Sequence, residues 1–196
     1  MESVEKIRAL GELRIRQALM PFVRLLVQFR ISPNQLSVVG VLMAACAAAF
    51  LIAGYPIAAG TLYLFGSTLD MLDGALARLD NRATAFGAFL DSTLDRVSEG
   101  LIFAAIAYRY ALNANGWMVV GVVLALLGSF LTSYTRARAE SLGVACKAGW
   151  ATRPERVILV STGLILNVME GVICLLALLT ALTSLQRIYY AYRHLQ

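Results

Sequence analysis

Long apolar stretches separated by short polar turns constrain the fold of this chain more than any other feature. Hydrophobic residues make up 59% of its 196 residues and charged residues only 15%, whereas a soluble domain carries about 25% charged residues. A helix needs roughly 20 apolar residues to cross a bilayer. Six stretches approach or reach that length, at about 35–53, 57–79, 84–108, 117–134, 154–166 and from 168 onwards. The sequence therefore predicts an all-α integral membrane protein whose residues 33–196 form a core of six transmembrane helices.

Residues 1–32 follow a different pattern, in which apolar and basic residues alternate with a helical period. Apolar positions such as Ile7, Leu10 and Leu19 are interleaved with six Lys or Arg residues. We expect this segment to be an amphipathic juxtamembrane helix that lies on an anionic membrane surface. A helix that packs towards solvent is the alternative. Both regions are expected to form one domain, residues 1–196.

The basic residues are distributed unevenly along the chain. Of the 17 Lys and Arg residues, six precede Pro33 and five lie within 136–156, whereas the turns near 54–56 and 167–170 contain none. The positive-inside rule then places both termini, the turn near Asp80 and the 136–156 loop on the cytoplasmic side of the cell membrane. Because these residues flank membrane spans, the net charge of +5 does not indicate nucleic-acid binding.

Two pairs of aspartates interrupt the second and third apolar stretches, Asp70 with Asp73 and Asp91 with Asp95. Spacings of three and four place each pair on one helix face. The tight turn between the two stretches predicts that their helices are antiparallel neighbours, so that the pairs face each other. Four unpaired carboxylates this close would repel one another and take up protons, which a bound divalent cation prevents. Hard oxygen ligands favour Mg²⁺ or Mn²⁺ over Zn²⁺, and the sequence predicts a site for two such ions.

Two glycines and an arginine are interleaved with these acids. Gly74 and Gly87 remove side chains near the carboxylates, and Arg78 supplies a fixed positive charge for a phosphate. A carboxylate site with two metals clamps phosphoryl oxygens, so the spacing predicts metal-dependent phosphoryl transfer at the cytoplasmic membrane surface. The alternatives are an ion-pair network, in which Arg78 and Arg96 neutralise aspartates, and a cation or proton transporter.

From Asp70 to Asp95 the chain matches D-x2-D-G-x2-A-R-x8-G-x3-D-x3-D at every fixed position. This pattern resembles the signature of the CDP-alcohol phosphotransferase family, and the resemblance implies a homodimeric membrane enzyme. It implies that the ligands of two metal ions are Asp70, Asp73, Asp91 and Asp95. Asp95 would also act as the general base on the acceptor hydroxyl. The residues that would hold the CDP-lipid are Asn34, Gln35, Leu36, Ser37, Asp70, Gly74, Arg78, Thr84 and Gly87.

Three later stretches resemble the bacterial phosphatidylinositol phosphate synthases of that family. They are S-Y-T-R-A-R-A-E-S-L-G at 133–143, R-P-E-R at 153–156 and Q-R at 186–187. The resemblance implies transfer of the phosphatidyl group of CDP-diacylglycerol to inositol 1-phosphate, with release of CMP. The residues that would receive the acceptor phosphate are Arg136, Arg153, Arg156 and Arg187.

Two positions depart from those synthases and affect the acceptor pocket. Arg136 stands where a Lys is frequent, and Thr152 stands where a Glu is common. Within the family, the alternatives are an archaetidylinositol phosphate synthase and a phosphatidylglycerophosphate synthase, which uses glycerol 3-phosphate.

Overall fold

The computed structural model describes residues 32–71, 84–146 and 148–195, and within these ranges the regular secondary structure is α-helix alone. The helices are α2 (Pro33–Ile52), α3 (Pro56–Met71), α5 (Ala85–Leu112), α6 (Gly116–Ser141), α7 (Arg153–Ile165) and α8 (Met169–His194). The prediction of an all-α chain is confirmed for these ranges. The amphipathic helix predicted over 1–32 and the turn predicted near Asp80 lie outside the described residues, apart from Ser32.

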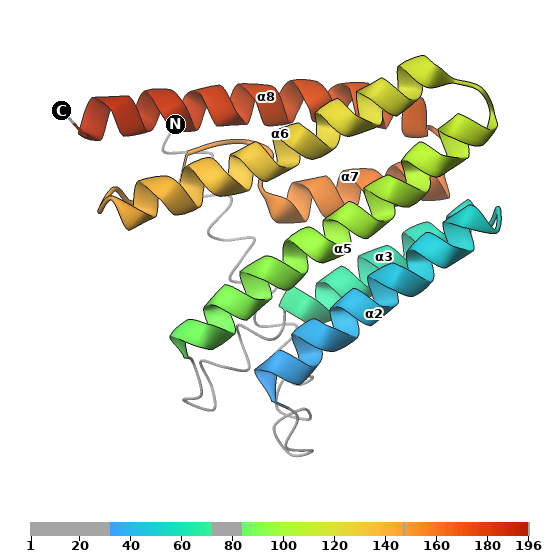
Figure 1. Cartoon of the computed structure of the whole chain (residues 1–196), viewed down its shortest axis with the longest axis horizontal. Coiled ribbons are helices and arrows are strands. Elements are labelled where there is room, and N and C mark those ends of the chain that lie inside the picture. Colours follow the sequence, from blue (N-terminus) through green and yellow to red (C-terminus); the bar gives the residue numbers. More distant parts are fainter. Residues whose placement is uncertain (1–31, 72–83, 147, 196) are drawn as a thin grey trace.

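The six helices form a ring in which each packs against two others. The packing order around the ring is α2, α3, α7, α8, α6, α5 and back to α2. The turns that join α2 to α3, α5 to α6 and α7 to α8 all lie at one end of the bundle (Figure 1). The prediction that the second and third apolar helices are direct neighbours is corrected by this order, because α2 lies between α3 and α5 in the ring.

Local sequence explains where α2, α5 and α7 begin. Ser32 and Gln35 form a capping box at the start of α2, each side chain bonding the backbone N–H of the other. Thr84 caps α5 by accepting a 2.9 Å hydrogen bond from the Gly87 backbone N–H. Pro154 stands in the first turn of α7, where a missing N–H costs nothing.

Three of the described helices, α2, α6 and α8, are long and apolar enough to cross a membrane. Helix α5 has 28 residues but carries several charged side chains. Helices α3 and α7 are described over 16 and 13 residues, which is shorter than the roughly 20 residues of a typical span. The described part of the chain is therefore all-helical and typical of a membrane protein, and three of the six predicted spans have both the length and the hydropathy of a transmembrane helix.

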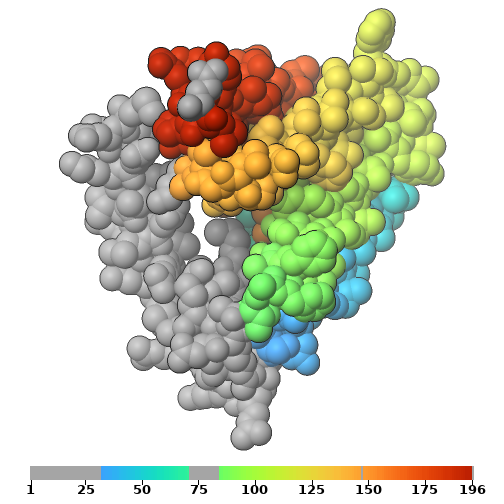
Figure 2. Space-filling model, turned by 60° about the vertical axis from the view of Figure 1, so that its left-hand side comes forward, coloured from blue at the N-terminus to red at the C-terminus, as the bar shows by residue number. Residues whose placement is uncertain are grey.

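Apolar side chains lie inside the ring and also on its outer surface. The interior contains Phe103, Ile106 and Ile173, each at most 2% exposed, whereas Leu42 and Leu178 are more than half exposed. In the space-filling view the end of α6 (orange) lies between α8 (red) and the start of α5 (green) (Figure 2). An apolar outer surface of this extent suits lipid rather than water.

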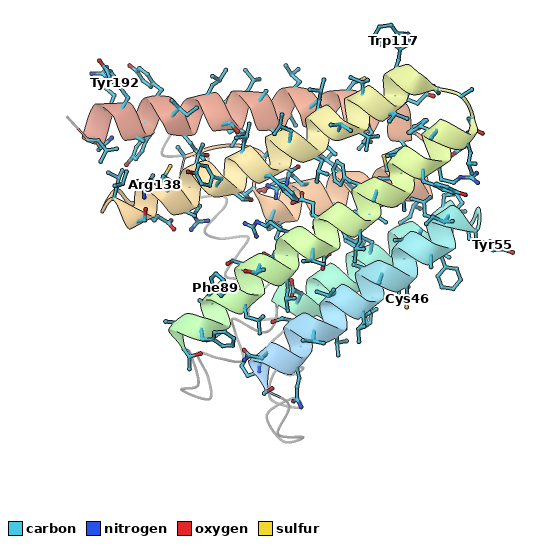
Figure 3. The ribbon with its side chains drawn as sticks, in the orientation of Figure 1. Cys46, Tyr55, Phe89, Trp117, Arg138 and Tyr192 are labelled. Carbon is cyan, nitrogen blue, oxygen red and sulfur yellow. The ribbon has the colours of Figure 1, made fainter. Side chains whose placement is uncertain are left out.

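Aromatic and basic residues mark the two ends of the bundle. Tyr55 and Trp117 extend outwards at the end that holds the three turns, and Arg138 and Tyr192 extend at the opposite end (Figure 3). Trp and Tyr are enriched at both membrane–water interfaces. This distribution is typical of a helical bundle whose two ends meet the two membrane–water interfaces.

Helices α3 and α7 approach each other closely at Gly60. A Cβ atom at this position would lie 2.8 Å from the backbone oxygen of Ser161 and 2.9 Å from a side-chain carbon of Ile165. Since a backbone oxygen cannot rotate away, a larger residue must separate the two helices.

We expect Gly60→Ala to lower the free energy of unfolding by about 1–3 kcal/mol, the usual cost of forcing extra carbon into a packed contact. Thermal unfolding in detergent, followed by circular dichroism, measures the change. Gly171→Ala is the matched control, because nothing lies within 4 Å of its added Cβ and alanine favours a helix. Equal melting temperatures for the two variants would contradict the α3–α7 contact.

Candidate active site

Three carboxylates converge inside the ring at the end opposite the three turns. Asp70 lies near the end of α3, and Asp91 and Asp95 lie one turn apart on α5. One oxygen from each of the three lies within 4.8 Å of the others. Asp70 and Asp95 are buried, at 4% and 9% exposed. Asp73, the fourth predicted ligand, lies outside the described residues.

Gly40 on α2 leaves room for the Asp70 side chain of α3. A Cβ atom at Gly40 would lie 3.1 Å from the Cβ of Asp70 and 3.4 Å from its Oδ1. The missing side chain therefore leaves the space that the Asp70 carboxylate needs. This role of Gly40 was not predicted, because only the packing of α3 on α2 reveals it.

Arg153, the first residue of α7, lies between two of the carboxylates. Its Nη2 atom is 2.5 Å from Oδ2 of Asp70 and 2.6 Å from Oδ1 of Asp95. Arg96 makes a longer contact with Asp95, at 3.3 Å. The sequence offered Arg78 and Arg96 as partners of the aspartates only in the alternative of an ion-pair network. Arg153 was expected at the acceptor phosphate from the family resemblance, and its contact with Asp70, 83 residues away, was not predicted.

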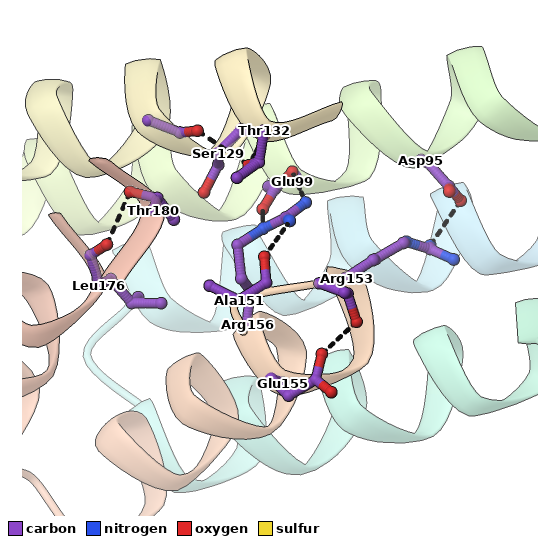
Figure 4. Close-up of polar contacts among 12 residues, drawn as sticks. Asp95, Glu99, Ser129, Thr132, Ala151, Arg153, Glu155, Arg156, Leu176 and Thr180 are labelled. Atoms are coloured by element: carbon purple, nitrogen blue, oxygen red, sulfur yellow. Dashed lines mark hydrogen bonds and ion pairs between the residues drawn. The ribbon is translucent and has the colours of Figure 1, made fainter. Parts of the chain in front are cut away.

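A second buried ion pair lies one helical turn further along α5. Glu99 accepts hydrogen bonds of 2.7 and 3.1 Å from Nε and Nη2 of Arg156 (Figure 4). Both side chains are buried, at 6% and 2% exposed, and Nη1 of Arg156 also donates to the backbone oxygen of Ala151. Glu99 follows Asp95 by four residues, so helical spacing alone places both on one face. Its partner could not be identified from that spacing.

The pair gives Arg156 a structural role. The family resemblance placed this residue at the acceptor phosphate, and in the structure three of its five N–H groups donate to Glu99 or Ala151. In this arrangement Arg156 joins α7 and the 142–152 loop to α5.

The loop between α6 and α7 is held from the opposite side by α8. Thr183 accepts hydrogen bonds from the backbone N–H groups of Trp150 and Ala151, at 3.3 and 3.1 Å. Arg187 donates to the backbone oxygen of Ala148 at 2.8 Å and to that of Thr132 on α6. The loop is thus bonded to α8 and, through Arg156, to α7, and Arg187, at 4% exposed, is largely buried.

The fourth predicted acceptor residue, Arg136, differs from the other three. Its side chain is 52% exposed and bonds Glu140, one turn along α6, at 2.8 Å. Arg136 is therefore on the surface of the loop region, whereas Arg153, Arg156 and Arg187 line its interior face.

Several residues predicted to hold the CDP-lipid come together at the starts of α2 and α5. A Cβ atom at Gly87 would lie 3.1 Å from Oγ1 of Thr84 and 3.3 Å from Oδ1 of Asn34. Gln35 takes part in the α2 capping box, and Leu36 is buried, at 5% exposed. The structure thus places Asn34, Thr84 and Gly87 next to one another.

Three further residues were predicted to hold the CDP-lipid, namely Ser37, Gly74 and Arg78. Ser37 is buried, and its hydroxyl donates to the backbone oxygen of Pro33 at 3.3 Å. Gly74 and Arg78 lie outside the described residues.

The geometry suits a divalent cation and a phosphorylated substrate. Carboxylate oxygens are the ligands that Mg²⁺ and Mn²⁺ prefer, and the guanidinium of Arg153 already lies between Asp70 and Asp95 as a positive charge. Helix starts with free N–H groups favour anions, and α2, α5 and α7 begin at this end. The site can therefore bind a metal ion and phosphate groups side by side.

We expect Glu99→Ala and Arg156→Ala each to destabilise the protein by about 3–5 kcal/mol, because each leaves one buried charge without its partner. The double variant should lose less than the sum of the two, since neither charge then remains. Melting in detergent of the parent, both single variants and the double variant measures this coupling. Arg138→Ala is the control, because its guanidinium is on the surface and bonds only a nearby serine. Strictly additive losses would mean that the pair does not join α5 to α7.

A family model described as CDP-alcohol phosphatidyltransferase matches residues 30–183. Relatives match over most of the chain. The archaetidylinositol phosphate synthase of Pyrococcus horikoshii is 36% identical over 93% of this chain and 95% of its own length. The phosphatidylinositol phosphate synthase of Corynebacterium glutamicum is 35% identical over 74% of this chain and 67% of its own.

Solved structures of the Mycobacterium tuberculosis phosphatidylinositol phosphate synthase have the same fold. The structure with CDP-DAG bound superposes with a TM-score of 0.80 at 30% identity and covers 88% of this chain and 92% of its own. A second structure of that protein, in complex with manganese and citrate, has the same TM-score and identity. The acid spacing, the cluster of Asp70, Asp91 and Asp95, and these similarities agree, and they favour an enzyme over a transporter. This chain belongs to the CDP-alcohol phosphatidyltransferase family.

Proposed function

We propose that this protein is a phosphatidylinositol phosphate synthase, which transfers the phosphatidyl group of CDP-diacylglycerol to inositol 1-phosphate and releases CMP. The observation that supports this most directly is Arg153, which contacts Asp70 and Asp95 at 2.5 and 2.6 Å. An acceptor phosphate held by Arg153 would bring the attached inositol ring next to the acid cluster.

The choice of acceptor also has support from the relatives. Those from archaea and those from actinobacteria differ in the lipid that their names give, but both groups are named as inositol phosphate lipid synthases. A phosphorylated acceptor fits the arginines near the α6–α7 loop, because a guanidinium binds phosphate in a bidentate fashion. In this proposal Arg153, Arg187 and Arg136 attract the phosphate, and Arg156 positions Arg153 through the first turn of α7.

The proposal includes an architecture in the membrane. All six described helices span the bilayer of the cell membrane as one domain, with residues 1–32 as an interfacial helix and the active site and both termini on the cytoplasmic side. Arg136 and Arg138 at the end of α6 support this orientation through the positive-inside rule. A homodimer is part of the same proposal, since the exposed apolar helix faces can pack against a second copy.

The carboxylates would hold two Mg²⁺ ions, or Mn²⁺ in their place. The ligands are Asp70, Asp91 and Asp95, with Asp73 from outside the described residues. Metal ions bound there would neutralise the pyrophosphate and stabilise the departing CMP. Asn34, Thr84 and Gly87 at the starts of α2 and α5 would bind the nucleotide, together with Gly74 and Arg78.

In the transfer step, Asp95 acts as the general base. Its carboxylate takes the proton of the acceptor hydroxyl while the hydroxyl oxygen forms a bond to the β-phosphorus. The bond between that phosphorus and the bridging oxygen breaks, and CMP leaves with the electron pair. The buried position of Asp95 and the apolar ring around it keep bulk water away from the β-phosphorus.

The substrate assignment predicts the outcome of a CMP-release assay on purified protein with Mg²⁺. CDP-diacylglycerol is offered with inositol 1-phosphate, inositol or glycerol 3-phosphate in parallel. CMP release should depend on inositol phosphate, because uncharged inositol has no group for Arg153 and glycerol 3-phosphate places its hydroxyl differently. Release with glycerol 3-phosphate alone would instead identify a phosphatidylglycerophosphate synthase.

An archaetidylinositol phosphate synthase is the second candidate. It is favoured by the 36% identity over 93% of the chain to the Pyrococcus horikoshii enzyme of that name. The same assay with CDP-archaeol separates the two, since faster turnover of this lipid than of CDP-diacylglycerol would assign the archaeal type.

We expect Asp95→Asn to keep the melting temperature within a few degrees and to lower kcat by about 10²–10⁴-fold, the usual contribution of a general base. The asparagine preserves size and keeps one oxygen that can accept from Arg153, but it cannot take up the proton. Ser92→Ala on the exposed face of α5 is the control, since its hydroxyl bonds only the backbone of Phe89. Near-normal turnover in Asp95→Asn would exclude Asp95 as the base.

A further inference from the structure

A cavity of about 150 Å³ lies at the end of the bundle opposite the acid cluster. The three turns between paired helices surround it. Its floor includes Leu51, Ile106 and Leu164, and its polar lining includes Arg109, Asn113 and Asn167. The volume is well above the roughly 15 Å³ that one water requires, so a small headgroup has room to enter.

Arg109 is the unusual residue in this cavity. The segments 50–58, 105–120 and 160–175 form this end of the bundle, and they contain no other Lys or Arg. Within the described part of the chain, the Arg109 side chain has no hydrogen-bond or ion-pair partner. Its Nη1 atom lies 3.9 Å from the position of a Cβ at Gly54, beside the α2–α3 turn. Its place in the last turn of α5 gives a favourable interaction with the helix dipole but no bonded anion.

The cavity lies at the depth of lipid headgroups. Trp117 is 88% exposed and Tyr55 is 62% exposed, and both extend from this end (Figure 3). Such aromatic residues mark the membrane interface. An arginine at this depth, above an apolar floor, faces phosphate groups on one side and acyl chains on the other.

We propose that this cavity binds the headgroup of an anionic phospholipid, whose phosphate pairs with Arg109 and whose upper acyl chain covers the apolar floor. Asn113 and Asn167 can donate hydrogen bonds from their amides to the phosphate or to a headgroup hydroxyl. Glu170, the one acidic residue in the 160–175 segment, is exposed and disfavours a second negative charge. A headgroup with a single negative charge therefore fits best. The site is separate from the acid cluster and does not depend on the reaction assigned to it.

A tryptophan at the rim of the cavity can report which lipid is bound. Val168 is exposed and lies between Asn167 and Met169, two of the lining residues. The reporter protein carries Val168→Trp, with Trp117→Phe and Trp150→Phe, so that the chain has one tryptophan. It is reconstituted into phosphatidylcholine bilayers that contain brominated phosphatidylglycerol or brominated phosphatidylcholine. The ratio of fluorescence quenching by the two gives the local preference for the anionic lipid.

The reporter should prefer phosphatidylglycerol, and Arg109→Gln should reduce that preference about fivefold. This factor corresponds to about 1 kcal/mol, the usual value of one Lys or Arg beside anionic lipid. Arg109→Lys should retain most of the preference. Asn113→Phe keeps the charge but places a ring at the rim, and it should also reduce the preference. Arg138→Gln at the other end is the matched control and should change nothing.

Each result decides the proposal. No preference in the reporter, or an equal preference after Arg109→Gln, would overturn it. An effect of Arg109→Gln without any effect of Asn113→Phe would also overturn it, because the charge alone would then act and the cavity would not. Melting in neutral detergent checks that the variants are folded. If Arg109→Gln does not fold, Arg109→Lys and Asn113→Phe still test the site.

Discussion

The pairing of buried charges inside an apolar ring is the interaction on which this structure depends. A charge removed from water is costly unless an opposite charge and hydrogen bonds accompany it. Arg153 lies between Asp70 and Asp95, and Glu99 binds Arg156 through two hydrogen bonds. These contacts join α7 to α3 and α5, helices that are distant in sequence. Helix α7 thus supplies positive charges that stabilise the carboxylates inside the ring.

The same contacts divide the basic residues into two groups with different tasks. Arg156 donates three hydrogen bonds, to Glu99 and Ala151, so it stabilises the position of the α6–α7 loop. Arg153, one turn earlier, faces the carboxylates and is available to a substrate phosphate that approaches them. Small residues serve the arrangement as well, since Gly40 leaves room for Asp70 and Gly60 lets α3 approach α7. The helix contacts that pack the ring are thus the same contacts that position the charged side chains of the site.

Much of the fold followed from the sequence because apolar length and helix-capping residues act locally. The starts of α2 and α5 agree with the predicted stretches to within two residues, and α7 begins one residue before its predicted start. The neighbour relation of α3 and α5 was wrong, because a short turn fixes which helices follow each other but not which helix packs between them. Asp91 and Asp95 could be assigned to one face from their spacing, and their proximity to Asp70 is present in the structure.

By itself the sequence determined the all-helical membrane class, the face that carries each aspartate and the family to which the spacing belongs. These properties depend on residues within one or two helical turns of one another, or on a contiguous pattern. The tertiary structure alone decided which arginine meets which carboxylate, and it placed Arg109 in a cavity between three turns. Partners separated by 57 or 83 residues have no common period in the sequence. Their contact arises only when the ring of helices closes.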